Sequence, residues 1–419
     1  MVAINQNHIP RLPLPIRCFN GAGKIFNTVG IKPVNLSPTQ LMAEAQSRSG
    51  LSDFGDDYFR QPFNLLMQSM EEEAGLTWLG RIIARGEILK NLQNRLKLVD
   101  AFKKNPALAD QPVHKPMLIV GLPRTGTSIM HELMAQDPEN RVPMTWEVEH
   151  PFPAPETATF KTDPRIAAVE KNLSGVDKLM PEFKKMHPMG AEFPQECVVF
   201  TGLDFASVIF DTQYRLPTYQ RWLDQADLSQ VYKNHRRFLQ FLQSKTEVKQ
   251  WVLKTPGHLW VMDQLMAEYP DANIIQTHRD PIRVLTSVSS LIATLRSMAS
   301  DQVDIREVAA HQAELLSDAL NRAMATRAAG KVPDDQVIDV HFKDFMQDPV
   351  AMMDRIYQHF GRTLSDQAAA NMQQFLAANP SDKHGRHSYS FADTGLDLAT
   401  ERQRFGAYQS HFDIASEAV

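Results

Sequence analysis

The stretch Pro116-Met-Leu-Ile-Val-Gly121-Leu-Pro-Arg-Thr-Gly126-Thr-Ser128 decides the fold of this chain. Its apolar residues 117–120 predict a short strand. A glycine-containing turn follows, and then a helix with apolar residues at helical spacing. A strand, a glycine loop and a helix N-terminus together gather backbone N–H groups around a phosphate. The stretch therefore predicts an anion-binding loop.

The loop departs from the common nucleotide-binding pattern at one position. The spacing of Gly121 and Gly126 matches GxxxxGK[ST], but Thr127 stands where that pattern has its lysine. Arg124 is the only cation within the loop. This difference argues against an ordinary ATPase. It favours a ligand whose terminal group is not a γ-phosphoryl held on magnesium.

The composition is that of a soluble globular protein. The 419 residues are 43% hydrophobic and 22% charged, with a net charge of −5, which argues against a general nucleic-acid binder. Cys18 and Cys197 are the only cysteines, so no disulfide framework is expected and a reducing compartment fits. No apolar run approaches a membrane span, and the N-terminus lacks an apolar signal core. We expect a cytoplasmic protein.

A helical region precedes the loop. Ser37-Pro-Thr-Gln40 is typical of a helix start, and apolar residues recur at helical spacing from there to Lys104. We therefore divide the chain into a helical N-terminal region, 1–106, and an α/β domain, 107–419. We expect residues 1–36 to pack across the body. The alternative is that they touch a membrane surface through Ile16, Phe19, Ile25, Phe26 and Val29.

Strands and helices alternate after the loop. Further strands are expected over 251–254, 272–278 and 337–341, each followed by a helix with an apolar face. Such alternation predicts a parallel sheet covered by helices on both faces, in a P-loop-like three-layer α/β fold. Residues from about 151 to 250 interrupt the pattern as a mostly helical insertion.

Three polar segments should meet at one edge of this sheet, because ligands bind at the carboxyl ends of parallel strands. The first is the loop 121–128. The second is Lys254-Thr-Pro-Gly-His258, and the third is Thr277-His-Arg-Asp-Pro281. Ser287 lies two helical turns after Arg279, so a guanidinium and a hydroxyl are placed to share a phosphate monoester.

The loop, the strand-end lysine and the Arg…Ser pair together resemble the sulfotransferases that use 3′-phosphoadenosine-5′-phosphosulfate (PAPS). The likeness is greatest to the bacterial branch with an N-terminal helical region, which also has a late segment like residues 389–408. It covers about residues 40–415. The resemblance implies a donor site whose residues are Pro123, Arg124, Thr125, Gly126, Thr127, Ser128, Arg279 and Ser287.

The implied reaction moves a sulfuryl group from PAPS to an acceptor hydroxyl, with an amine as second choice, and releases adenosine 3′,5′-bisphosphate. Such a transfer requires in-line positioning, donors on the leaving phosphate and a base. Arg124 and the loop amides would hold the phosphosulfate, and Lys254 would neutralise charge on the bridging oxygen. The sequence shows no HExxH motif and no other group of metal ligands, so we expect no metal.

The base is open between a carboxylate and a histidine. In part of the family a glutamate after the first strand–helix unit takes the proton, and Glu147 falls at that place. In another branch a histidine two residues after the lysine does so, but position 256 is proline and the nearest histidine is His258. We expect Glu147, with Glu149, His150 and His258 as rivals.

Other readings remain open. A kinase-like phosphotransferase of the P-loop class would bind Mg-ATP more tightly than the bisphosphate. A non-catalytic scaffold would bind nucleotide equally well after Lys254→Ala. The acceptor is a small molecule or a lipid-like alcohol, and an oligomer is possible. The basic stretch 383–387 is a candidate clamp over the 3′-phosphate.

Overall fold

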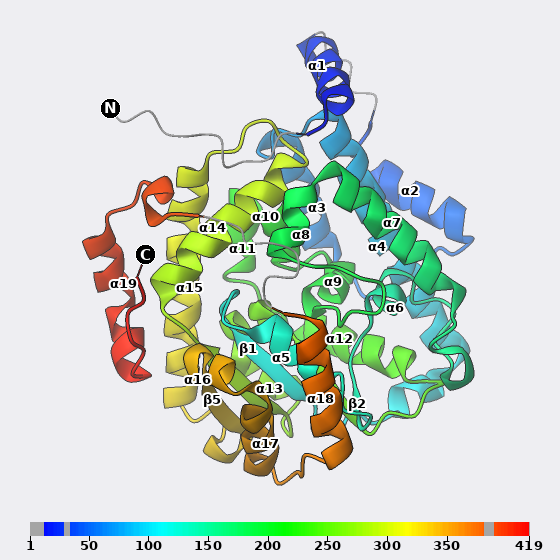
Figure 1. The fold of residues 1–419 in the computed structure, drawn as a ribbon. Helices are drawn as coiled ribbons and strands as arrows, with labels where there is room; N and C mark the ends of the chain where they lie inside the picture. The colour runs from blue at the N-terminus through cyan, green and yellow to red at the C-terminus, as the bar shows by residue number, and fades with distance from the viewer. Residues whose placement is uncertain (1–11, 29–33, 381–388, 419) are drawn as a thin grey trace.

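The computed structural model describes residues 12–28, 34–380 and 389–418. In this part of the chain a parallel sheet lies at the centre, with strand order β2-β3-β1-β4-β5 (Figure 1). The strands are β1 (Met117–Gly121), β2 (Asn140–Arg141), β3 (Gln250–Lys254), β4 (Asn273–His278) and β5 (Val337–His341). The predicted parallel sheet is confirmed. The edge strand β2 was not predicted, because two residues carry no periodic signal.

Alternate residues of the central strand enter two separate cores. Leu118 and Val120 point into one apolar cluster, and Met117 and Ile119 point into the other. Helices on the first face are α12 (Ser229–Leu242), α13 (Met262–Glu268), α14 (Pro281–Ser297), α15 (Ile305–Ala328) and α19 (Leu398–His411). Helices on the second are α5 (Thr127–Met134), α16 (Phe342–Gln347), α17 (Pro349–His359) and α18 (Asp366–Ala378). The result is the predicted three-layer arrangement.

A third apolar cluster holds three N-terminal helices together. These helices are α2 (Pro38–Ser49), α3 (Arg60–Glu72) and α4 (Trp78–Lys104), and α1 (Leu14–Thr28) precedes them outside this cluster. Helix α2 begins as expected, with Ser37 at the N-cap and Pro38 at N1, but the Ser37 side chain makes no capping bond. The cluster also contains Phe205 and Phe210, which come from the insertion. The division of the chain at residues 106 and 107 stays a prediction.

The insertion is mostly helical between β2 and β3. Its helices are α6 (Thr145–Glu149), α7 (Pro164–Leu179), α8 (Pro181–Met186), α9 (Cys197–Thr201), α10 (Ile209–Gln213) and α11 (Pro217–Leu223), before α12. Short 3₁₀ turns join the elements. They are η2 (Pro106–Asp110), η3 (Thr157–Thr159), η4 (Gly202–Asp204), η5 (Pro256–Val261), η6 (Asp334–Gln336) and η7 (Phe391–Thr394).

Helix α1 projects from the body at one end of the molecule (Figure 1). Phe19 and Phe26 each lie with their ring centroids 5.4 Å from the Trp78 ring, so part of α1 packs on α4 as expected. Leu14 and Ile25, however, are 67% and 71% exposed. Val29 lies outside the described residues.

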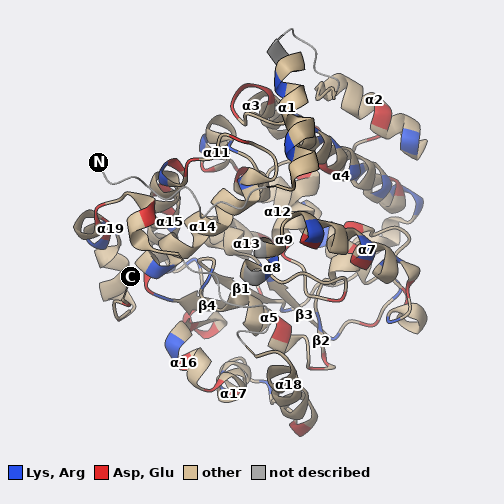
Figure 2. Ribbon diagram, turned by 45° about the horizontal axis from the view of Figure 1, so that its top comes forward, with Lys and Arg blue, Asp and Glu red and all other residues tan. Residues whose placement is uncertain are grey.

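Basic and acidic positions are interspersed along the described ribbon, as Figure 2 shows. This mixed distribution along the chain differs from a basic stripe, which is typical of a nucleic-acid binder. Within the described segments, every helix falls short of the combined length and apolar character that a bilayer crossing requires.

Candidate active site

The predicted loop follows β1 and leads directly into α5. Gly121 has φ 143°, and a Cβ there would lie 2.2 Å from Thr277 Oγ1, so only glycine permits this approach of β1 to β4. Gly126 has φ 89°, and a Cβ there would lie 3.1 Å from Phe342 Cδ2 and 3.2 Å from Phe345 Cδ1. Arg124 itself has φ 68°, an uncommon conformation for a non-glycine residue that clusters at functional sites. The surrounding fold therefore holds the loop in one specific backbone conformation.

Arg124 connects the loop to two distant segments. Its Nε donates to Ser287 Oγ at 3.2 Å, and its Nη1 donates to the Met186 carbonyl at 2.9 Å. Arg279 Nη1 donates to the Arg124 carbonyl at 3.0 Å. Burial and, to a lesser extent, the charge of Arg279 lower the pKa of Arg124, while Tyr389 opposes them. The structure thus brings together Arg124, Arg279 and Ser287, three of the predicted donor residues.

The two threonines of the loop are buried and pack against neighbouring parts of the fold. Thr125 Oγ1 donates to the Leu122 carbonyl at 2.6 Å and lies 2.6 Å from Thr277 Oγ1, fully buried. Thr127 is buried as the first residue of α5. Pro123 precedes Arg124 in the turn. Roles for these residues at the donor stay predictions.

Lys254 lies at the end of β3 and joins the loop helix to the insertion. Its Nζ donates to Ser128 Oγ at 3.2 Å and to Glu196 Oε1 at 2.5 Å, and only 3% of its side chain is exposed. Thr255 Oγ1 also donates to Glu196 Oε2, at 3.4 Å. Burial alone would raise the pKa of Glu196, but Lys254 and His187 outweigh it and hold that pKa well below its ordinary range. Lys254 therefore has a carboxylate partner that the sequence reasoning did not assign.

The preferred base, Glu147, has its carboxylate engaged elsewhere. Arg141 donates to both oxygens, Nη1 to Oε1 at 2.6 Å and Nη2 to Oε2 at 2.5 Å, and the Met144 N–H donates to Oε1 at 2.7 Å. The side chain is fully buried. This arrangement caps α6 and braces β2, so the structure does not present Glu147 as a free base. Its catalytic role stays a prediction.

Two of the rival bases also have partners. Glu149 forms an ion pair with Lys90 at 2.5 Å. His150 is the C-cap residue of α6, and burial, its largest influence, lowers its pKa. His258 lies 1% exposed within η5, with Nδ1 2.8 Å from the Tyr232 hydroxyl. Burial lowers the pKa of His258 to about 3. Glu196 differs from these three residues because its carboxylate accepts a hydrogen bond from Lys254.

His258 also belongs to a group of metal-ligand types that sequence reasoning missed. Cys197, His235 and His258 come from α9, α12 and η5, and their donor atoms all lie within 4.8 Å of one another. The three residues form no local motif, and only the packing of three elements reveals the group. The expectation that the chain holds no such group was wrong.

An apolar hollow opens beside the lysine segment. It is partly open to solvent and is lined by Val198, Val208, Leu223, Tyr232, Thr255 and His258 among others. Thr255 connects it to Glu196 through the hydrogen bond above. An apolar pocket next to convergent polar groups is the usual form of a small-molecule site.

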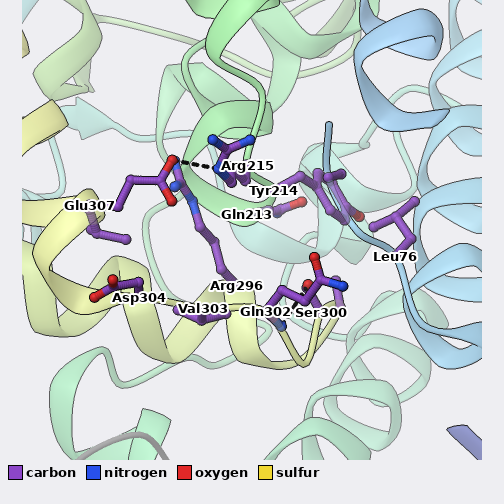
Figure 3. A pocket seen from close by; sticks show the side chains of 13 residues that line it. Leu76, Gln213, Tyr214, Arg215, Arg296, Ser300, Gln302, Val303, Asp304 and Glu307 are labelled. Carbon is purple, nitrogen blue, oxygen red and sulfur yellow. Dashed lines mark hydrogen bonds and ion pairs between the residues drawn. The ribbon is translucent and has the colours of Figure 1, made fainter. Parts of the chain in front are cut away.

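A second hollow lies near the C-terminal end of α14 and is lined by Arg215, Arg296 and Glu307 among others (Figure 3). Arg215 donates to Glu307 there at 2.5 Å, and Arg296 pairs with Asp211 at 3.0 Å. Both arginines are thus paired with carboxylates. Ser287 lies nine residues before Arg296, in the N-terminal half of α14. This hollow does not belong to the loop site. The stretch 383–387, the candidate clamp, lies outside the described residues.

Comparison with known proteins accords with this geometry. A family model described as "Sulfotransferase family" matches residues 116–366, more than half of the chain. The curated omega-hydroxy-beta-dihydromenaquinone-9 sulfotransferase Stf3 of Mycobacterium bovis is 25% identical over 273 residues. That match covers 62% of this chain and 66% of the length of Stf3, somewhat less than two thirds.

Two solved structures are similar over nearly the whole chain. Sulfotransferase STF1 from Mycobacterium tuberculosis H37Rv is 33% identical, with a TM-score of 0.80 over 90% of this chain and 100% of its own. Sulfotransferase STF9 from Mycobacterium avium is 28% identical, with a TM-score of 0.84 over 93% of this chain and 100% of its own. The family match covers all three strand-end segments, the loop included. Together with this structural similarity, it establishes that the chain belongs to the sulfotransferase family.

Proposed function

We propose that this protein transfers a sulfuryl group from PAPS to the hydroxyl of a lipid-like acceptor and releases adenosine 3′,5′-bisphosphate. One observation carries the proposal. The fold brings Ser287 and Arg279 each into contact with Arg124 of the loop, and Lys254 reaches the helix after the loop through Ser128. Cations, a hydroxyl and helix N–H groups converging at one sheet edge suit a ligand with two separate anionic groups.

The donor would occupy two parts of this edge. We assign the loop amides and Arg124 to the 5′-phosphosulfate, because the loop leads into the N-terminus of α5 and Arg124 is the cation of the loop. Arg279 and Ser287 hold the 3′-phosphate, in accord with their shared contact to Arg124. The same arrangement offers no lysine at position 127 for a γ-phosphate, and no observation favours the kinase or the scaffold alternative.

The transfer itself is an in-line displacement. The acceptor oxygen attacks sulfur, the bond from sulfur to the bridging oxygen breaks, and the electron pair leaves with the bisphosphate. Lys254 donates a hydrogen bond to that bridging oxygen and stabilises its developing charge. The acceptor proton goes to a carboxylate, and we assign Glu196 to this step because its Oε1 lies 2.5 Å from Lys254 Nζ.

The pair explains how a carboxylate held at low pKa becomes a base. While Lys254 contacts Glu196, the pKa of Glu196 stays depressed and its affinity for a proton is small. When Lys254 turns to the bridging oxygen, Glu196 loses a main source of that depression. Burial then raises its pKa towards the range a general base requires. Donor binding would in this way activate the base.

The nature of the acceptor is proposed from two observations. Stf3, by its name, acts on a hydroxylated dihydromenaquinone, and the apolar hollow beside Thr255 is open to a lipid-like chain. The exposed Leu14 and Ile25 of α1 would help the protein approach such a substrate at a lipid surface. Cytoplasmic residence and an oligomeric state stay predictions.

The test begins with isothermal titration of adenosine 3′,5′-bisphosphate into the full chain. We expect micromolar binding without added metal, lost in Arg279→Ala and retained in Arg355→Ala, which changes an exposed arginine of α17. Transfer of labelled sulfur from PAPS to a polyprenyl alcohol is measured next. Mg-ATP binding tighter than that of the bisphosphate would overturn the proposal, and so would equal binding by wild type and Arg279→Ala.

A further inference from the structure

A buried group of one thiol and two imidazoles lies beneath the lysine segment. Cys197 begins α9, His235 lies in α12 and His258 lies in η5. All three are at most 1% exposed, and their donor atoms lie within 4.8 Å of one another. The proposed transfer chemistry uses none of the three, so the cluster needs its own explanation.

The two histidines leave one ring nitrogen each without a partner. Nε2 of His235 and Nε2 of His258 are buried and make no hydrogen bond. Buried polar atoms are nearly always paired, and an unpaired one is costly, so two in one small group point to a missing occupant. One ring nitrogen of each histidine belongs to the group that also contains the Cys197 sulfur, and we assign the unpaired Nε2 to it. The occupant must accept contacts from all three.

The remaining ring nitrogens are held by tyrosines. His235 Nδ1 lies 2.7 Å from the Tyr269 hydroxyl, and His258 Nδ1 lies 2.8 Å from the Tyr232 hydroxyl. A hydrogen bond at one ring nitrogen fixes the tautomer and orientation of a histidine whose other nitrogen binds metal.

We propose that Cys197, His235 and His258 form a binding site for a zinc-like divalent cation, with one thiolate and two imidazole ligands. Sulfur and imidazole nitrogen are the donors that zinc prefers, and three protein ligands leave a fourth position for water. Zn–N bonds of about 2.0–2.1 Å and Zn–S bonds of about 2.3 Å would draw the donor atoms closer together by roughly 1 Å. The thiol loses its proton to solvent when the metal–sulfur bond forms.

The surroundings provide a route and a purpose for the ion. His258 and Tyr232 line the apolar hollow, which gives the ion and its water access to the cluster. Cys197 directly follows Glu196, and His258 lies four residues after Lys254. The ion would therefore tie together the two segments that bring Glu196 and Lys254 to 2.5 Å. Its role is structural support of the proposed catalytic pair, and its binding does not depend on the proposed function.

Cobalt provides the direct test, because a cobalt–thiolate bond gives a charge-transfer absorption that other ligands lack. The full chain, prepared with EDTA and without a histidine tag, is titrated with Co²⁺ and then with Zn²⁺. We expect one equivalent to bind with the thiolate absorption, and zinc to displace it. Metal content measured by mass spectrometry and the melting temperature with and without zinc give independent readings.

The two cysteines of the chain supply a matched pair of variants. Cys18 is exposed and Cys197 is buried, so Cys18→Ser should keep the absorption and the zinc-dependent rise in melting temperature, and Cys197→Ser should lose both. Tyr232→Phe preserves the ring, and it should weaken cobalt binding by about 10–100-fold through the orientation of His258. Failure of the wild type to bind cobalt would overturn the proposal and indicate a buried water instead. An absorption that survives in Cys197→Ser, or binding unchanged in Tyr232→Phe, would also overturn it.

Discussion

The carboxylate of Glu417 holds the guanidinium of Arg279 in a two-point pair. Arg279 Nε donates to Oε1 at 2.9 Å and Nη2 donates to Oε2 at 2.9 Å. Arg279 also stacks on the Phe342 ring, 4.1 Å from its centroid, and Arg283 lies 3.9 Å from the same carboxylate. Two parallel bonds to a planar anion are also the way in which an arginine binds a phosphate. Glu417 therefore takes the hydrogen-bond donors of Arg279, the arginine that we assign to the 3′-phosphate.

Removing this carboxylate should favour the nucleotide. In Glu417→Gln, adenosine 3′,5′-bisphosphate should bind more tightly, by up to about fivefold, since a partly exposed ion pair is worth about 1 kcal/mol. Isothermal titration measures the change. Asp413→Asn is the control, because Asp413 is exposed on the same segment. Unchanged affinity in Glu417→Gln would show that the carboxylate does not compete with the ligand.

Replacing Glu196 should remove the base while keeping the donor site. We expect Glu196→Gln to lower kcat by about 10²–10⁴-fold, as is typical of a lost general base. Affinity for the bisphosphate should not fall, since the glutamine places no new charge beside Lys254. Glu192→Gln, an exposed carboxylate on the same stretch, should keep its rate. A normal rate in Glu196→Gln would remove Glu196 from the mechanism and return attention to Glu147.

Glu147 should matter to stability instead of chemistry. Its pair with Arg141 is buried, so Glu147→Gln leaves a buried guanidinium short of its partner and should cost about 3 kcal/mol of unfolding free energy. Urea unfolding measures this, with the exposed Glu139→Gln as a comparison that should leave stability unchanged. The sulfuryl-transfer rate per folded molecule should be retained. A stable Glu147→Gln with no transfer activity would reverse the assignment of the base.

The buried histidines should make the protein less stable in mild acid. Burial lowers the pKa of His131 and His258 to about 3, and that of His235 well below its ordinary value. Below about pH 6.5 the unfolded chain takes up protons that the folded chain does not, so stability falls as pH decreases from there. Each histidine should cost about 1 kcal/mol at a pH one unit below 6.5.

Urea unfolding from pH 8 to pH 5.5 tests this slope. Stability should be level above the histidine range and decline below it. His131→Gln removes one of these histidines. The slope of the unfolding free energy against pH should therefore decrease by the contribution of about one bound proton. A flat profile across this interval would mean that the buried histidines take up protons in the folded state as readily as in the unfolded chain.

Local features of the chain were predictable because their signals lie within a few residues. The apolar residues 117–120, the two glycines and the start of α5 are contiguous, so strand, loop and helix could be read directly. The alternation of later strands and helices implied a parallel sheet. Arg279 and Ser287 are on neighbouring elements, and their meeting with Arg124 at the sheet edge follows from the fold class.

The partners of the site residues were not predictable in the same way. Glu196 lies 58 residues before Lys254, in the insertion, and no short-range pattern joins the two. Glu147 has the right place in the sequence for a base, but Arg141, six residues earlier, takes both of its oxygens. Sequence position alone does not say which charge a carboxylate meets.

The sequence by itself determined the strand–loop–helix unit, the layered parallel sheet and the membership of the family, because short-range periodicity and ordered motifs encode these. Only the tertiary structure decided that Lys254 pairs with Glu196, that Glu417 holds Arg279, and that Cys197, His235 and His258 meet. These contacts join segments far apart in the chain. Their geometry depends on how the insertion and the C-terminal segment pack, which no local pattern specifies.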